Sequence, residues 1–213
     1  MLYAYSTEVI KIRATPHTEA LCPQCNAVVI SKCGEINIWH WAHETRQDCD
    51  SWQDQHETQW HLEWKARFPS ECVEVCMEQN GVRHRADIRL PSGLVIELQH
   101  SSIATNDIKE RESFYGNMIW VFDVKDPYDC DRLLFIDKGA FISFRWLQPR
   151  KHLAYVRKPA YLDVGIDVLF NMRKMSFFKN ESTGSYRCGG WGKWVQLRSV
   201  TNGINVNRQT QTD

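Results

Sequence analysis

The sequence lacks the features that would place it at once in a familiar class. No apolar run approaches the ~20 residues of a membrane-spanning helix, and the opening stretch MLYAYSTEVIKIRATP lacks the apolar core of a signal peptide. There is no charge excess either, because 26 basic residues balance 26 acidic ones, which argues against a strongly basic nucleic-acid-binding protein. With 43% hydrophobic and 12% aromatic residues, however, the chain is too apolar for a disordered protein. We therefore expect a folded cytoplasmic protein with a substantial core.

The neutral total hides a segregation of charge along the chain. Residues 1–50 carry 4 basic and 6 acidic side chains, residues 51–139 carry 10 and 16, and residues 140–213 carry 12 and 4. An acidic middle segment suits a divalent cation, and a basic final segment suits phosphate groups. A nucleic-acid partner is therefore compatible with zero net charge.

Cysteines are frequent for a chain without an export signal, which favours metal ligands or free thiols over disulfides. Cys22 and Cys25 form a Cys-x2-Cys pair that can supply two corners of a tetrahedral Zn²⁺ site. His40, His43 and Cys49 are the candidates for the other two corners, and the spacing does not choose among them. A thioredoxin-type redox pair is disfavoured because no strand–CxxC–helix pattern surrounds these cysteines.

A helix is predicted over about 56–68, before Pro69. Trp60, Trp64 and Phe68 recur every four residues and form its apolar stripe. A polar stripe at the same spacing runs beside it, which indicates either a functional face or ordinary surface pairing. The polar stripe consists of Glu57, His61 and Lys65.

The strongest chemical signal is a predicted hairpin, with strands over 84–90 and 94–99 joined by Pro-Ser-Gly. Alternation along the strands places Asp87, Glu97 and Gln99 opposite the apolar face. Two carboxylates and an amide are hard oxygen ligands of the kind that Mg²⁺ or Mn²⁺ prefers. A hairpin with one solvated polar face gives the same alternation, so spacing alone leaves both interpretations open.

Further elements indicate a mixed α/β fold with a mixed sheet flanked by helices. Residues 106–115 read as a helix, and residues 118–124 read as a buried central strand. Other strands are expected at 28–30, 36–39, 141–147, 160–164 and 192–197, and a short helix at 167–175.

Several motifs in register resemble the competence protein CoiA-like family of the PD-(D/E)XK nuclease superfamily. They are the N-terminal CPxC…HWAH, the Glu-x3-His-x3-Lys helix, Arg-Ala-Asp-Ile at 85–88, IELQHSSI at 96–103 and Arg-x3-Tyr at 111–115. The resemblance spans roughly residues 20–125. It implies a restriction-endonuclease-like core behind an N-terminal zinc-ribbon-like module.

By this resemblance Asp87 and Glu97 are the ligands of a catalytic Mg²⁺ or Mn²⁺, and Glu57 completes the site. Gln99 stands where the superfamily usually has lysine, so it offers a dipole in place of a cation. The catalytic set expected from the family also includes His61 and Lys65. For the structural Zn²⁺, the family pattern favours Cys22, Cys25, His40 and His43, with Cys49 replacing His40 in the alternative set.

The basic C-terminal segment is the expected DNA-binding surface, together with Arg111. It contains Arg150 and Lys151, and the pairs at 157–158 and 173–174, with tyrosines and tryptophans among them. Cations that follow a backbone and aromatics that stack on bases suit single-stranded DNA.

These features lead to one preferred function and one alternative. We expect a metal-dependent nuclease that hydrolyses DNA phosphodiester bonds, with roles in DNA uptake, recombination or defence all compatible. The alternative is a catalytically degenerate DNA-binding adaptor with a structural zinc module, for which Gln99 is the main support. Three regions are predicted: a zinc module over 1–50, a nuclease core over 51–130 and a basic β-rich extension over 131–213.

Overall fold

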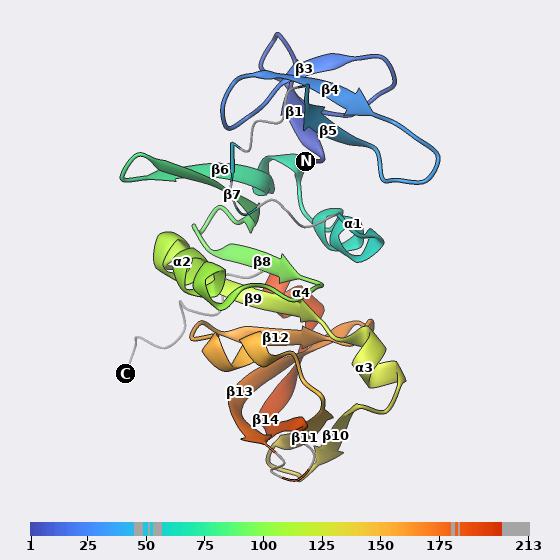
Figure 1. The fold of residues 1–213 in the computed structure, drawn as a ribbon, viewed down its shortest axis with the longest axis vertical. Helices are drawn as coiled ribbons and strands as arrows, with labels where there is room; N and C mark the ends of the chain where they lie inside the picture. The colour runs from blue at the N-terminus through green and yellow to red at the C-terminus, as the bar shows by residue number, and fades with distance from the viewer. Residues whose placement is uncertain (45–48, 51, 53–56, 180–181, 183, 202–213) are drawn as a thin grey trace. The chain divides into compact units, whose positions relative to one another are not determined.

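The computed structural model describes residues 1–44, 49–50, 52, 57–179, 182 and 184–201. The chain divides into two compact units, Met1–Ile96 and Glu97–Asp213, and the division falls within strand β8. Each unit is described by itself (Figure 1). The mixed α/β class is confirmed, with a large mixed sheet and few helices. No helix among the described residues is long and apolar enough to span a membrane.

The first unit begins with a five-stranded antiparallel sheet in the order β2-β1-β3-β4-β5. Its core gathers small residues around the fully buried indole of Trp41, among them Ala4, Ala20 and Val29. The predicted strand at 36–39 is wrong, because Ile36 is 95% exposed and the strand begins only at His40. The strands are β1 Tyr3–Tyr5, β2 Lys11–Arg13, β3 Glu19–Leu21, β4 Val28–Lys32 and β5 His40–His43.

Helix α1 and the hairpin strands complete the first unit. The helix spans Gln59–Lys65 and is shorter than predicted, because Thr58 caps its N-terminus and it ends before Pro69. Of the predicted helix, residue 56 lies outside the described residues. The predicted hairpin is confirmed, with Ile88 opposite Ile96 and Gly93 in the left-handed conformation that the tight turn requires (φ 84°). The elements are η1 Ser70–Cys72, β6 Val73–Gln79, β7 Val82–Arg89 and β8 Val95–Gln99.

The second unit is built on a mixed sheet in the order β10-β11-β14-β13-β12-β9. Strand β12 runs parallel to β9, and the other neighbouring pairs are antiparallel. Strand β9 (Met118–Asp123) is buried along its whole length, as the sequence predicted. The remaining strands are β10 Leu133–Asp137, β11 Ile142–Leu147, β12 Ala160–Asp163, β13 Val168–Lys179 and β14 Tyr186–Gln196.

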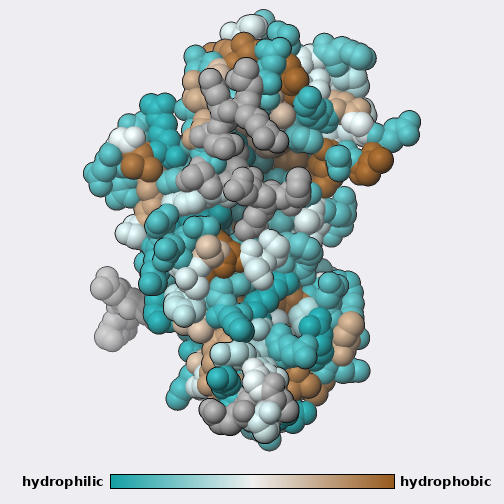
Figure 2. All heavy atoms as spheres, in the orientation of Figure 1, coloured by the Kyte–Doolittle hydropathy of each residue, from teal (hydrophilic) through white to brown (hydrophobic). Residues whose placement is uncertain are grey.

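The helices of the second unit are few and short. Helix α2 (Thr105–Tyr115) confirms its prediction and ends at Gly116. The helix predicted at 167–175 is wrong, because this stretch lies in β13 and pairs on both sides with β12 and β14. On the face drawn in Figure 2, hydrophobic residues form small groups among hydrophilic ones. The other helices are α3 Lys125–Asp129, η2 Lys151–Tyr155 and α4 Leu197–Thr201.

Candidate functional site

A tight turn after β3 brings Cys22 and Cys25 together. The Cys22 N–H donates to the Ala27 carbonyl at 2.8 Å, and the Asn26 N–H donates to the Cys22 carbonyl at 2.9 Å. Asn26 adopts the left-handed conformation (φ 60°), which asparagine tolerates better than most residues. The Gln24 N–H points at the Cys22 sulfur at 3.4 Å. This turn presents both thiols on one side and supplies one of them with a backbone donor.

His43 and Cys49 complete a cluster of four ligands around the same point. One ligand atom from each of Cys22, Cys25, His43 and Cys49 lies within 4.8 Å of all the others. The Sγ atoms of Cys22 and Cys49 are 3.7 Å apart, and Cys25 Sγ is 3.2 Å from His43 Nε2. Burial and the neighbouring Cys22 thiol raise the pKa of Cys49, and a bound cation would favour its thiolate.

The donor set and spacing of this cluster fit zinc. Zn–S bonds of about 2.3 Å in a tetrahedron give sulfur–sulfur edges of about 3.8 Å, close to the Cys22–Cys49 distance. The favoured set with His40 is corrected in favour of the alternative set with Cys49. His40 and His43 are three residues apart on β5 and therefore face opposite sides, and the His40 Nδ1 lies 2.8 Å from the Ile38 carbonyl.

Two buried side chains connect the thiol cluster to strand β7. The Gln24 amide donates to the carbonyls of Cys49 at 2.6 Å and Arg83 at 2.8 Å. Asp50 follows Cys49 directly, and its carboxylate accepts from the Arg85 N–H at 2.9 Å and lies 3.0 Å from His84 Nδ1. The ligand cysteines are thereby fixed to the strand that carries Asp87.

A second cluster in the first unit surrounds the ammonium of Lys65, which is 5% exposed. Its Nζ lies 2.9 Å from a Glu57 oxygen, 3.3 Å from Glu74 and 3.2 Å from Asp87. Glu74 is itself buried and accepts from the backbone N–H groups of Leu2 and Tyr3 at 2.8 to 3.1 Å. One lysine thus holds three carboxylates from three different segments of the chain.

The charges of this lysine–carboxylate cluster stabilise one another. Burial acts to lower the pKa of Lys65, but the carboxylates of Asp87, Glu74 and Glu57 outweigh it and raise that pKa above its ordinary value. Burial acts to raise the pKa of Glu74, and Lys65 and Arg85 outweigh it and hold that pKa below the usual carboxyl range. Lys65 and Glu74 therefore stay charged at neutral pH.

The structure brings together two of the three members of the predicted polar stripe. Glu57 and Lys65 form an ion pair, although Glu57 precedes the N-cap residue Thr58 and so lies outside α1. His61 is buried, and its Nδ1 lies 2.8 Å from the Thr58 hydroxyl and 3.3 Å from the Thr58 N–H in a capping box. The local role of His61 is therefore to fix the start of the helix that carries Lys65.

In the second unit, Glu97 and Gln99 are both buried, at 2% and 0% exposure. The polar hairpin positions on β8 are therefore not a solvated face. Arg111 from α2 donates to Glu97 at 2.7 Å, and the Gln99 amide donates to the Ser101 carbonyl at 2.9 Å. Arg111 is itself buried, so its place in a surface for DNA is corrected: it holds a carboxylate in the interior.

The other two predicted DNA contacts lie at the start of η2. Arg150 is partly buried, and this burial lowers the pKa of its guanidinium. Lys151 is exposed, with its Nζ 4.5 Å from the ring centroid of Tyr186. Of these two residues, Lys151 is the more accessible to phosphate.

Sequence reasoning missed three acidic residues with structural roles at these sites. Glu74 and Asp50 organise the first unit as described above. Glu112 does the same in the second unit, where one of its carboxylate oxygens accepts from the Trp120 indole and from two backbone N–H groups. Each of these residues is a single acid in an otherwise unremarkable stretch, so only burial reveals its importance.

Comparison with known proteins bears on the first of these regions. Residues 5–51 match the family model of the N-terminal domain of competence protein CoiA. The N-terminal part of the chain, residues 5–51, is thus similar to this domain. The match contains all four ligands of the thiol cluster, and it confirms the resemblance that the CPxC…HWAH pattern indicated. The comparisons with curated proteins and with solved structures give no match. The resemblance to a PD-(D/E)XK core stays a prediction.

Proposed function

We propose that this CoiA-like protein is a divalent-metal-dependent nuclease that hydrolyses DNA phosphodiester bonds. The match of residues 5–51 to the competence protein CoiA N-terminal domain suggests a competence-related function. The observation that carries the proposal is the buried Lys65 ammonium beside the Asp87 carboxylate, at 3.2 Å. The nuclease motif usually has a lysine where this chain has Gln99. The Lys65 ammonium beside Asp87 supplies a positive charge next to a proposed metal ligand in its place.

The residues proposed for the catalytic metal have suitable chemistry. Asp87, Glu97 and Glu57 would hold Mg²⁺ or Mn²⁺, since all three offer hard carboxylate oxygens. Asp87 directly precedes Ile88, which is paired with Ile96 in the hairpin of the first unit. When bound by these carboxylates, such a metal would supply Lewis-acid chemistry for phosphodiester hydrolysis.

The chain's own residues perform the remaining tasks in this proposal. Lys65 orients the Asp87 carboxylate through their ion pair at 3.2 Å. Arg111 orients Glu97 in the same way. The Gln99 amide is buried and donates to the Ser101 carbonyl, so in this proposal it fixes the end of the strand that carries Glu97. His61 contributes by capping the helix on which Lys65 stands.

The test compares cleavage of labelled single- and double-stranded DNA with Mg²⁺, with Mn²⁺ and without either ion. Asp87→Asn and Glu97→Gln should each lower the cleavage rate by about 100-fold or more, because each removes a charged metal ligand. Glu110→Gln is the matched control, since it neutralises an exposed glutamate on α2. Unchanged cutting by Asp87→Asn would contradict the assignment.

One observation favours the second candidate, a DNA-binding adaptor with a degenerate site. All three proposed metal ligands are already ion-paired, Glu57 and Asp87 with Lys65 and Glu97 with Arg111, and position 99 is a glutamine. The same assay distinguishes the two functions. Binding of DNA without cleavage by the wild-type chain in both metals would establish the adaptor and reject the nuclease.

A further inference from the structure

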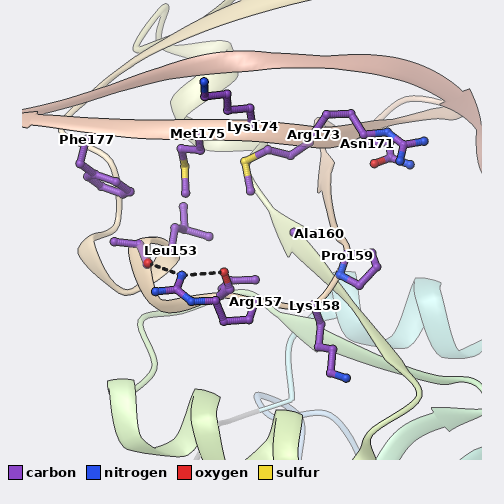
Figure 3. A pocket seen from close by; sticks show the side chains of 13 residues that line it. Leu153, Arg157, Lys158, Pro159, Ala160, Asn171, Arg173, Lys174, Met175 and Phe177 are labelled. Atoms are coloured by element: carbon purple, nitrogen blue, oxygen red, sulfur yellow. Dashed lines mark hydrogen bonds between the residues drawn. The ribbon is translucent and has the colours of Figure 1, made fainter.

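A cavity of about 610 Å³ lies within the second unit, between β13 and the segment that includes η2 and leads to β12 (Figure 3). Its apolar lining includes Leu153, Met172, Met175 and Phe177. Figure 3 shows Met175 and Phe177 reaching from β13 toward the opposite wall. Thioether and aromatic side chains of this kind adapt to a flat apolar group.

Four cations also line this cavity, and none of the lining residues is acidic. The cations are Arg157, Lys158, Arg173 and Lys174. None of them forms an ion pair with any other residue that the structure describes. The Lys158 and Lys174 side chains extend outward from the cavity (Figure 3). This charge is complementary to a ligand with more than one anionic group.

Buried contacts hold one wall of the cavity in place. The carboxylate of Glu112 accepts from the backbone N–H groups of Arg157 at 2.9 Å and Lys158 at 3.1 Å. The Trp120 N–H donates to the Pro159 carbonyl at 2.9 Å. The Arg157 guanidinium donates to the carbonyls of Ala154 and Val156 through one nitrogen, which leaves its other donors for a ligand. The two cations at 157 and 158 are therefore positioned before any ligand binds.

The other wall contains a β-bulge at Arg173. The pairing with β14 shifts between Met172, opposite Gly192, and Lys174, opposite Trp191, so Arg173 has no opposite residue. The bulge needs glycine on the neighbouring strand: a Cβ at Gly190 would lie 1.8 Å from the Lys174 carbonyl oxygen, and one at Gly192 would lie 2.2 Å from that of Asn171. Bulges commonly redirect side chains at binding sites, and here the bulged residue is a cation of the cavity.

We propose that this cavity binds single-stranded nucleic acid, with a base inserted among Met175, Phe177 and Leu153 and the flanking phosphates on Arg157 and Arg173. An apolar space bordered by fixed cations matches a nucleotide unit, which joins a flat ring to anionic groups. A base in a duplex is paired and stacked, so a single strand is the form that can offer one. The outward Lys158 and Lys174 extend the contact along the strand.

Binding of a labelled oligothymidine of about 12 nucleotides, measured by fluorescence anisotropy without Mg²⁺ or Mn²⁺, tests this site. The double variant Arg157→Gln/Arg173→Gln should weaken binding about 10-fold or more, and it should reduce the salt slope by about 1.4. The matched control removes two exposed lysines of the same unit that do not line the cavity, Lys109→Gln/Lys138→Gln. Equal losses in the two double variants would overturn the proposal.

Insertion of a base is tested separately from charge. Met175→Trp fills the cavity and should weaken binding while leaving the salt slope unchanged. In the wild-type chain, an oligonucleotide with 5-iodouracil should crosslink to the peptide that contains Phe177, a result that does not depend on folding of a variant. Crosslinks only at other segments would reject insertion into this cavity.

Alternative ligands are tested in the same binding assay. Oligouridine in place of oligothymidine distinguishes RNA from DNA as the source of the strand. Tighter binding to duplex DNA, or to vesicles containing phosphatidylserine, would overturn the assignment to a single strand. The binding assay contains no Mg²⁺ or Mn²⁺, so it measures binding at this cavity without cleavage. Binding here and cleavage by the proposed nuclease are therefore separate results, and either can fail alone.

Discussion

The two clusters of the first unit differ in how they hold several acidic side chains close together. Cys22, Cys25, His43 and Cys49 bring three thiols and an imidazole together without a cation among them. Glu57, Glu74 and Asp87 bring three carboxylates together around the ammonium of Lys65. The first arrangement needs an external cation to hold its ligands as anions, whereas the second contains its own. The difference separates a cluster that could bind zinc from one that already contains a cationic side chain.

The largest expected effect comes from disrupting the thiol cluster. Cys22→Ser removes a zinc ligand, and bound structural zinc contributes on the order of 10 kcal/mol to folding in small domains. We expect the β1–β5 sheet to lose its protection in hydrogen exchange measured by mass spectrometry. Cys130→Ser is the control because Cys130 is exposed and lies in the second unit. Full protection in Cys22→Ser would show that packing around Trp41 suffices without the metal.

Removing the internal cation is the next test. Lys65→Met leaves three carboxylates without their shared partner, and the free energy of unfolding should fall by about 3–5 kcal/mol. Chemical denaturation measures the loss, and Lys138→Met on the surface should change stability by less than about 0.5 kcal/mol. Adding Asp87→Asn to Lys65→Met should recover part of the loss. If the double variant is no more stable than the single one, the two side chains do not interact.

The smallest effect concerns His152, a buried histidine that forms no ion pair with the other residues that the structure describes. Burial, reinforced by Arg150, lowers the pKa of His152 to about 4, so this histidine is neutral in the folded state. In the unfolded chain this histidine binds a proton near pH 6.5. The stability that the neutral His152 ring contributes is therefore complete above that pH. This stability is lost as the pH falls below 6.5, by about 2 kcal/mol at pH 5.

His152→Gln should flatten the pH dependence of the free energy of unfolding between pH 7 and pH 5. Chemical denaturation followed by tryptophan fluorescence measures it. A titration of the His152 ring by NMR gives the pKa directly. A midpoint near 6.5 would show that the ring is solvated and would remove the contrast with Lys65, which stays charged when buried.

Local signals predicted the parts of the fold that local forces determine. Pro-Ser-Gly fixed the hairpin that carries Asp87, and a continuous apolar run identified β9. The stretch 167–175 was misread because its apolar and basic residues also fit a helical period, whereas pairing with β12 and β14 decides for a strand. Long-range pairing of this kind cannot be read from a short window.

The candidate sites were predictable to different degrees for the same reason. Spacing identified Cys22 and Cys25, but the choice between His40 and Cys49 depends on which face of β5 each histidine occupies. The spacing placed Glu57 and Lys65 on one stripe, but the structure pairs them with Glu57 outside the helix, and Glu74 joins them through the fold. The Glu74 backbone is in the left-handed conformation (φ 50°), which no sequence pattern signals for glutamate.

The zinc content of the purified full-length chain tests the contrast between the two clusters most directly. We predict one zinc ion per chain in the wild type and in His40→Gln, and strongly reduced zinc in Cys49→Ser. Zinc that is lost in His40→Gln but retained in Cys49→Ser would contradict the ligand set. A folded wild-type protein without zinc would contradict the claim that the thiol cluster depends on an external cation.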